Sequence, residues 1–528
     1  MNFLKKVCSN KKVVFTILLI ISGLCSFYRL TEASLRFDEA MEYMISISDW
    51  DVMYGLICRT FQPPLYNAIM HVWLSLSDSI LLFKLSTVIF YTIGTLGLIK
   101  CVYYIKKTVA SVVIAIVVQF SFSAMIYYSQ ICGEYIMVFP ILYWLLYITV
   151  KMIREKKFSQ IVLWIILAVL AMGMQYGAMF TIFGAGIVSL GYFLFKKEYK
   201  ALKQLLITGV SAIILFMVPL YMFFARVQME SQRNAGQISS EWSAKTIIQG
   251  WLDAIQFMLF SWHNNYKESI LKLFGLSCII FVCLVIITAI VKYKQKAEMN
   301  KEVLGGEVGI IILIGVISYF AYGLGVAAGI YAYGNYTSRH TALMIPVVVA
   351  SLSCFISSIY KLVIIQIKKM KINLTAIIIM MNLGMFSVNT IHYVWYENWD
   401  YDQLDTAIEI VNLVDKDIPV WVSLMAVPTV IVYDNQPLEI RKEQYLRYMN
   451  DEDLKVQSEN YIYSKSDDIM EDFDNKLPEE CVVVITDFPE TMENVQKAFL
   501  EQGYEEMILQ EAKESAMSPG TCVIKYTK

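Results

Sequence analysis

Long apolar segments alternate with short polar ones along most of this chain. Eleven such segments occur, at residues 13–30, 79–105, 109–128, 135–152, 158–174, 177–195, 204–225, 268–292, 307–330, 341–366 and 372–392. Each has roughly the 20-residue length that a helix needs to cross a bilayer. The pattern predicts a polytopic α-helical membrane domain, with about 11 transmembrane helices, over residues 1–392. A shorter amphipathic stretch at 63–77 favours an interfacial or re-entrant helix.

Basic residues between the apolar segments test this count. If successive segments cross the membrane in alternating directions, the basic groups lie on the same side as the N-terminus. These groups are Lys106–Lys107, Lys151–Lys157, Lys196–Lys203, Lys292–Lys301 and Lys361–Lys371. The other side receives the lysine-poor segments 31–78, 129–134, 175–176, 226–267 and 331–340. Because lysine-rich loops face the cytoplasm, we predict a plasma-membrane protein with a cytoplasmic N-terminus.

The composition changes near residue 393. Residues 393–528 are rich in Asp and Glu and contain no apolar segment of spanning length. Short apolar runs at 420–424, 430–433, 481–485 and 521–524 are expected as strands, and helical patterns lie at 402–414 and 492–502. Strands alternating with helices predict a small extracytoplasmic α/β domain.

Composition and charge narrow the picture further. Of the 528 residues, 57% are hydrophobic, above the roughly 45–50% of soluble domains. The net charge of −2 gives no support for a nucleic-acid partner. The ten cysteines lack metal-type spacing. Cys481 and Cys522 could form a disulfide or simply be buried in strands. The lysine-rich N-terminus resembles a signal peptide but lacks a small-residue cleavage site, so we expect an uncleaved first helix.

An acidic pair, Asp38-Glu39, follows the first apolar segment on the predicted outer side. Ionisable residues beside hydrocarbon are candidates for function. A carboxylate there can accept a proton from an attacking hydroxyl. The alternative is a helix cap, because acidic residues are common in the first turn and residues 40–45 have a helical pattern.

A second landmark in the same predicted loop is Gln62-Pro63-Pro64-Leu65-Tyr66. Alone it predicts a turn followed by a helix start. Together with Asp38-Glu39 it resembles the first outer loop of the glycosyltransferase C superfamily. The most similar branch is the protein O-mannosyltransferase and aminoarabinose-transferase type, bacterial enzymes of the family 39 kind.

The resemblance extends to Tyr128-Ser129-Gln130-Ile131-Cys132-Gly133-Glu134-Tyr135, similar to a Y-S-Q-E-A-R-x-Y element of bacterial relatives. Ile131 stands where the family has an acid and Gly133 where it has an arginine. Glu134 is the acidic residue nearest to these positions.

Two later elements are also similar to the family. Gln175-Tyr176 lies where relatives carry a Thr-His-Tyr element, and its alternative is an interfacial tyrosine. Arg339-His340, followed by Pro346, is similar to R-Y-x-x-x-x-x-P, and its alternative is a snorkelling arginine. Outer aromatic residues could stack on sugars or form a membrane-interface belt. They are Trp242, Trp251, Trp262, Tyr266, Tyr331, Tyr333 and Tyr336. The Asn398-Trp399-Asp400 element is similar to a D-W element near which the outer domain of relatives begins.

The resemblance implies an inverting membrane glycosyltransferase that takes a sugar from a polyprenyl-phosphate carrier. The acceptor would be a hydroxyl of a glycan, lipid or protein outside the cytoplasm. It assigns Asp38 as base and Arg339, His340 and Arg59 to the donor phosphate. Glu39, also catalytic, would bind hydroxyls of the acceptor or donor, or tune Asp38. The expected substrate-binding residues are Gln62, Tyr66, Tyr128, Gln130, Glu134 and Tyr176. No cofactor or metal is expected, although some superfamily members use a divalent cation.

Two other functions stay open. A catalytically inactive relative that binds lipid-linked sugar would account for Ile131 and Gly133. A transporter or flippase of lipid-linked sugars is the other alternative. Against the transporter, the sequence lacks a matching pair of Gly/Pro-interrupted spans, and its acids lie in an outer loop rather than at mid-membrane.

Overall fold

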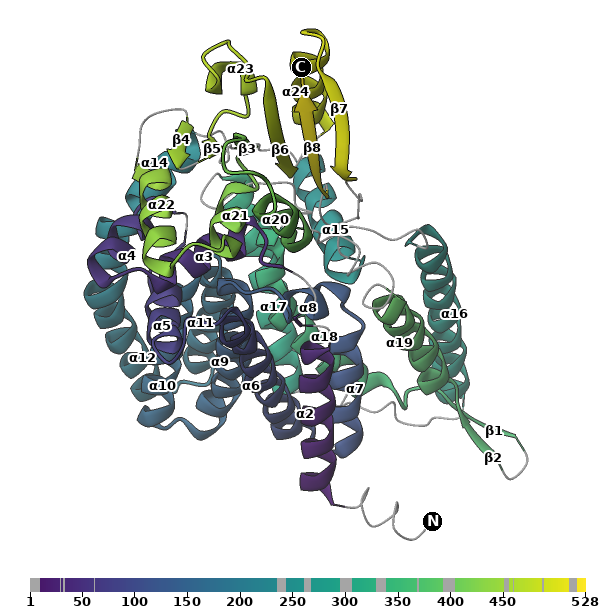
Figure 1. Cartoon of the computed structure of the whole chain (residues 1–528). Helices are drawn as coiled ribbons and strands as arrows, with labels where there is room; N and C mark the ends of the chain where they lie inside the picture. The colour runs from purple at the N-terminus through teal and green to yellow at the C-terminus, as the bar shows by residue number, and fades with distance from the viewer. Residues whose placement is uncertain are drawn as a thin grey trace. The chain divides into compact units, whose positions relative to one another are not determined.

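The computed structural model describes residues 10–28, 30–31, 34–60, 62–234, 244–260, 267–294, 306–328, 339–367, 370–392, 404–450, 455–458, 460–486, 489–511 and 520–528. The chain divides into two units. Figure 1 labels their helices and strands. The first comprises residues 1–28, 58–66 and 85–393, and the second comprises residues 29–57, 67–84 and 394–528.

Helices form most of the first unit, and each of the eleven apolar segments is mainly helical where the structure describes it. Eight of the described helices are long and apolar enough to cross a membrane, and two shorter apolar helices accompany them. The helices are α2 (Lys11–Phe27), α6 (Ile80–Lys106), α7 (Val109–Phe120), α8 (Ser123–Tyr128), α9 (Glu134–Glu155), α10 (Phe158–Met174), α11 (Ala178–Phe195), α12 (Tyr199–Ala212), α13 (Val218–Leu220), α14 (Arg226–Asn234), α15 (Ala244–Phe260), α16 (Lys267–Lys294), α17 (Glu307–Ala327), α18 (Ile345–Ile359) and α19 (Leu374–His392). The predicted class, a polytopic helical membrane protein with a small C-terminal sheet, is confirmed.

Three boundaries in this unit differ from the sequence prediction. The third predicted span is broken, because α7 ends at Phe120 and α8 begins only at Ser123. The span expected to reach residue 366 ends at Ile359. The chain then forms an antiparallel hairpin of β1 (Ile364–Ile367) and β2 (Met370–Asn373). Residues 244–260, expected in a loop, form helix α15.

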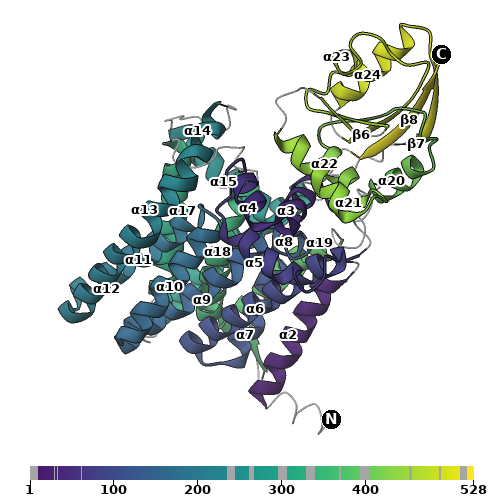
Figure 2. The same ribbon diagram turned by 60° about the vertical axis from the view of Figure 1, so that its left-hand side comes forward.

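Small residues let three helices of this unit approach closely. A Cβ placed on Gly184 of α11 would lie 2.2 Å from Ser318 Oγ of α17, and one on Gly315 would lie 2.3 Å from Ser351 Oγ of α18. Such small-residue contacts are how membrane helices gain packing without a hydrophobic driving force. Figure 2 shows the neighbouring helices α9, α10 and α11 running alongside one another.

Contacts between helix ends test the alternating topology. Lys106 Nζ, at the end of α6, donates to Ser358 Oγ at the end of α18 (3.0 Å). Arg154, at the end of α9, forms an ion pair with Glu307 at the start of α17 (3.5 Å between Nη1 and Oε1). These segments were all assigned to one side from their lysines, and the structure brings them together at one end of the unit.

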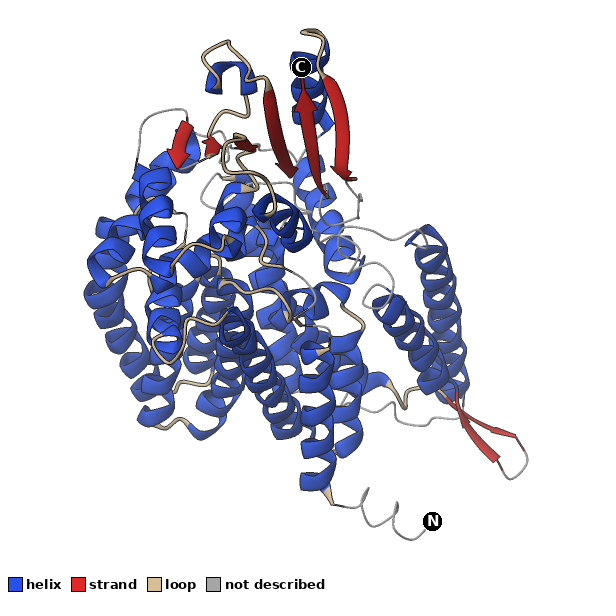
Figure 3. Ribbon diagram, viewed as in Figure 1, coloured by secondary structure: helices blue, strands red, loops and turns tan. Residues whose placement is uncertain are grey.

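The second unit contains a six-stranded mixed sheet in the order β4-β5-β3-β6-β8-β7. Figure 3 draws the strands in red. Its strands are β3 (Val420–Val422), β4 (Lys455–Ser458), β5 (Tyr461–Ser464), β6 (Glu480–Thr486), β7 (Glu505–Gln510) and β8 (Thr521–Thr527). Strand β3 is parallel to β5 and β6, and the other pairs are antiparallel. Its C-terminal helices are α20 (Leu404–Asn412), α21 (Val427–Tyr433), α22 (Leu438–Asn450), α23 (Ile469–Asp472) and α24 (Pro489–Leu500).

Aromatic packing and buried apolar strands form the core of this sheet. The rings of Phe499 and Tyr526 stack with centroids 4.0 Å apart. The indole of Trp421 is fully buried and donates to Asp472 Oδ2 at 2.8 Å. Three of the four expected strands are present. The fourth run, residues 430–433, lies in helix α21, because Pro428 suits a first helical turn and a fully buried run carries no distinguishing period.

The two cysteines of the tail are free and buried. They lie on the paired strands β6 and β8, but Cys481 is opposite Tyr526 and Cys522 is opposite Ile485. This offset along the strands separates the thiols. The structure therefore supports burial rather than the disulfide.

The second unit also includes helices α3 (Phe37–Ile47) and α4 (Trp50–Ile57), and most of α5 (Leu65–Leu74). Thus the predicted outer loop 31–78 is largely helical. The helix expected within residues 63–77 is present as α5. The acidic pair lies at the start of α3, as the helical pattern of residues 40–45 suggested.

Candidate functional site

The first turn of α3 carries the acidic pair. Glu39 is buried (4% exposed), and its Oε2 accepts a hydrogen bond from the Arg36 backbone N–H (3.2 Å), in the manner of a capping box. Asp38 is exposed. The two carboxylates are therefore in different environments: Glu39 fixes the helix start, and Asp38 is accessible to a substrate.

Helix α21 holds the residue that leads into α3. The Leu35 N–H donates to Tyr433 Oη at 2.9 Å, and Thr429 Oγ1 donates to the Leu35 carbonyl at 3.0 Å. Both Leu35 and Thr429 are fully buried. The C-terminal part of the chain thereby fixes the backbone directly before Asp38.

A third carboxylate, Glu42, lies one turn further along α3 and is buried (8% exposed). Asn67 Nδ2 of α5 donates to Glu42 Oε2 at 2.5 Å and lies 3.4 Å from Ser46 Oγ. Burial raises the pKa of Glu42 to about 7, against a smaller lowering by the Asn67 hydrogen bond. Glu42 was not among the residues predicted from the sequence. The available signal was its position three residues after Glu39, on an adjoining part of the same helix surface.

Three motifs that are far apart in the sequence meet in the first unit. Gln175 Nε2 donates to Gln62 Oε1 (2.8 Å) and lies 3.3 Å from Glu134 Oε1. Tyr176 Oη donates to Gln228 Oε1 (2.8 Å), and Gln228 Nε2 donates to the Gln62 carbonyl (2.9 Å). We call these five residues the Gln62 network. Three of them, Gln62, Glu134 and Tyr176, were predicted to bind substrate.

Burial sets the character of this network. Glu134, Gln175 and Gln228 are each less than 5% exposed. Burial, with the nearby Cys58, raises the pKa of the Tyr176 phenol, which keeps it a hydrogen-bond donor. Gln228 was missed, because nothing near residue 228 forms a motif and its role depends on contacts with distant segments.

The first residues of the Tyr128–Tyr135 element contact the end of α2, whereas Glu134 of the same element belongs to the Gln62 network. Gln130 Nε2 donates to the Tyr28 carbonyl (2.8 Å), and Ser26 Oγ donates to the Ser129 carbonyl (2.7 Å). The buried ring of Tyr128 lies 5.4 Å from that of Tyr135. The predicted substrate-binding role of Gln130 and Tyr128 stays a prediction.

The other predicted site residues are more dispersed. Tyr66 is buried at the start of α5, and Arg59 is exposed. Arg339 and His340 begin the 3₁₀ helix η3 (Arg339–Met344), and their side chains lie outside what the structure describes. Trp251 belongs to α15, where its ring lies 5.4 Å from that of Phe320. The remaining predicted outer aromatics and residues 398–400 fall outside the described residues.

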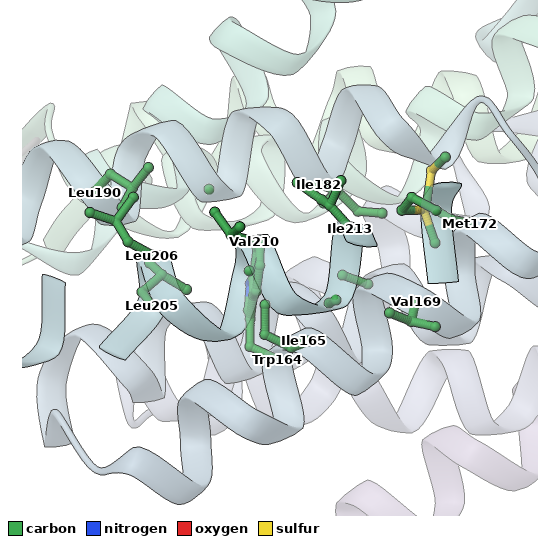
Figure 4. A pocket seen from close by; sticks show the side chains of 15 residues that line it. Trp164, Ile165, Val169, Met172, Ile182, Leu190, Leu205, Leu206, Val210 and Ile213 are labelled. Atoms are coloured by element: carbon green, nitrogen blue, oxygen red, sulfur yellow. The ribbon is translucent and has the colours of Figure 1, made fainter. Parts of the chain in front are cut away.

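An apolar cavity of about 270 Å³ lies among α10, α11 and the helices from α12 to the π-helical turn η1 (Ile213–Met217). Its lining residues are apolar side chains and glycines, among them Trp164, Ile182 and Val210, whose side chains gather around it in Figure 4. Along α10 the lining extends from Trp164 to Met172, about 12 Å of helix. Met172 is three residues before Gln175, so the cavity approaches the Gln62 network along α10.

No family matches the sequence, and no curated protein matches it. Among solved structures, ArnT from Cupriavidus metallidurans bound to undecaprenyl phosphate is similar with a TM-score of 0.43 and 11% identity, covering 97% of both chains. The same protein in the apo state is similar with a TM-score of 0.42 and 10% identity, again covering 97% of both chains.

Proposed function

We propose that this protein is a membrane glycosyltransferase that transfers a sugar from a polyprenyl-phosphate carrier to an acceptor hydroxyl on the extracytoplasmic face, with inversion. The observation that supports it is the convergence in the Gln62 network. The Gln62-Pro63-Pro64 element, the Tyr128–Tyr135 element that contains Glu134, and Gln175-Tyr176 were each selected from the sequence for resemblance to one enzyme class. They form one hydrogen-bonded group, although up to 113 residues separate the paired side chains of the motifs.

Asp38 is the proposed base. The acceptor oxygen forms a bond to the anomeric carbon, the bond from that carbon to the phosphate oxygen breaks, and the acceptor proton passes to the Asp38 carboxylate. One displacement assisted by one base inverts the anomeric centre, whereas a covalent enzyme intermediate would retain it. The exposure of Asp38 supports this role, since a base must reach its substrate.

The remaining roles follow from charge and polarity. Arg339, His340 and Arg59 are proposed to stabilise the charge that develops on the departing phosphate, because guanidinium groups match phosphate geometry. Polar side chains of the Gln62 network are proposed to bind sugar hydroxyls. Part of the polyprenyl tail would occupy the apolar cavity beside α10. No metal is assigned a role, so transfer should persist in EDTA.

Substitution of Asp38 tests the proposal. We expect Asp38→Asn to reduce transfer by at least about 100-fold, the usual contribution of a general base. The matched control is Asp49→Asn, which removes another exposed carboxylate from the same unit. Mass spectrometry of surface glycans and glycoproteins, from cells that express each variant, would measure new glycosidic bonds.

The other outcomes are informative. If the Asp38→Asn variant transferred sugar at the level of the wild type, Asp38 would be excluded as the base. Movement of lipid-linked sugar across the membrane with no new glycosidic bond would support a transporter instead. Binding of lipid-linked sugar without either activity would identify an inactive relative.

A further inference from the structure

A second cavity, of about 930 Å³, lies at the other end of the first unit from the Gln62 network. The ends of α6, α9 and α11 and the start of α17 surround it. Helix α9 connects the two sites, with Glu134 at one end and Arg154, which lines the cavity, at the other. Twenty residues of helix place them about 30 Å apart, close to the thickness of the hydrocarbon core. The cavity therefore lies at headgroup level.

The charged side chains that line this cavity are mostly basic. Among the described residues they are Lys106, Arg154, Lys156 and Lys196, with Glu307 as the one acidic lining residue. Glu307 pairs with Arg154, and Glu198 pairs with Lys156. Lys106 donates to the neutral Ser358 hydroxyl, and Lys196 lies 5.7 Å from the Phe195 ring. Within the described residues, neither Lys106 nor Lys196 has a carboxylate partner, so the cavity keeps a positive potential.

Apolar side chains make up much of the remaining lining. Ile105 of α6, Ile153 of α9 and Leu313 of α17 face the cavity together with Phe195, Val308 and Ile310. A site for a free inorganic anion would gain nothing from this surface. A phosphate that carries hydrocarbon chains would gain both the charge and the apolar contact.

We propose that this cavity binds the phosphate headgroup of an anionic phospholipid. Lys106 and Lys196 would contact the phosphate. The part of an acyl chain nearest the headgroup would contact Ile105, Ile153 and Leu313. Basic pockets between transmembrane helices on the cytoplasmic side are typical sites for such headgroups. The lysine distribution assigns this end to the cytoplasm. The bound lipid would join the ends of four helices and stabilise the unit.

Native mass spectrometry of the full chain, with phosphatidylglycerol or phosphatidylcholine added, would test this proposal. The test variant is Lys106→Gln/Lys196→Gln. Neither substitution leaves a described carboxylate without its partner, and glutamine can still donate to Ser358. The matched control is Lys200→Gln/Lys203→Gln, which removes two lysines near the same end that do not line the cavity. Thermal unfolding without added lipid checks that each variant is folded.

We expect phosphatidylglycerol to be retained on the wild type and the control at least fivefold more than on the test variant. Phosphatidylglycerol should raise the thermal midpoint of the wild type and of the control, but not that of the test variant. The proposal would be overturned if the wild type retained phosphatidylcholine as well as phosphatidylglycerol. It would also be overturned if both double variants lost phosphatidylglycerol to the same extent. Displacement of phosphatidylglycerol by millimolar inorganic phosphate would instead identify a site for free phosphate. If the test variant fails to fold, Lys196→Gln alone should still show the loss.

Discussion

The buried carboxyl group of Glu42 makes the stability of the second unit depend on pH. Its pKa is raised from 4.5 to about 7 by burial. Between these values the folded protein keeps a proton that the unfolded chain has lost, so the contribution of this group to stability is full at low pH and is lost as the pH rises through 7. Ionisation of the buried carboxyl at higher pH costs up to about 3 kcal/mol.

The thermal midpoint of the full chain should therefore fall between pH 5 and 8, and Glu42→Gln should reduce this fall. Glutamine keeps an oxygen that can accept from Asn67 but carries no charge. Glu443→Gln, at an exposed position on α22, is the control and should leave the slope unchanged. Identical slopes for the wild type and Glu42→Gln would show that Glu42 does not titrate in this range.

At the residue scale, the sequence located some of the site but not the environments of its residues. Asp38-Glu39 was predicted at a helix start, where Glu39 acts as a cap. Asp38 is exposed, and its role as base stays a prediction. Glu42 and Gln228 were missed because their roles depend on Asn67 and Gln62. These partners are brought close by tertiary packing, which a local pattern cannot contain.

At the scale of elements, α21 holds Leu35, two residues before the start of α3. Thr429→Val removes the hydroxyl that donates to the buried Leu35 carbonyl, and Tyr433→Phe removes the acceptor of the Leu35 N–H. Each leaves a backbone group without its partner, which costs about 1–3 kcal/mol.

Hydrogen exchange at the Leu35 amide should be faster in Tyr433→Phe than in the wild type. Tyr448→Phe, which removes a hydroxyl from α22 in the same unit, should leave it unchanged. Unchanged exchange in both variants would mean that the bond to Tyr433 does not protect this amide.

The elements themselves were largely predictable, because a run of about twenty apolar residues has few structures available in a membrane. The errors lie where the sequence gives two signals at once. Residues 430–433 are β-branched and aromatic, yet Pro428 and complete burial make them helical. The break after Phe120 has no proline or glycine to announce it.

At the scale of the whole molecule, two polar sites occupy opposite ends of the helical unit. This follows from α9, which carries Glu134 at its start and Arg154 in its last turn. The sequence predicted the alternation from lysines, since charge bias is set segment by segment and needs no knowledge of packing. The convergence of the Gln62 network could not be predicted in this way.

Single cysteines introduced at Lys196 and Gln130, in a background without other reactive thiols, should label from opposite sides of the membrane. A membrane-impermeant maleimide added to intact cells should modify Gln130→Cys and spare Lys196→Cys until the cells are opened. Labelling of both from outside would refute the alternating topology.

The buried thiols of the sheet have a practical consequence. Burial raises the pKa of Cys481 to about 12, so at neutral pH it is protonated and unreactive toward alkylating reagents. The sheet then tolerates dithiothreitol, since it contains no bridge to break between Cys481 and Cys522. Iodoacetamide would modify these positions only after the strands separate. Peptide mapping of the adducts over time would therefore measure the rate of local opening.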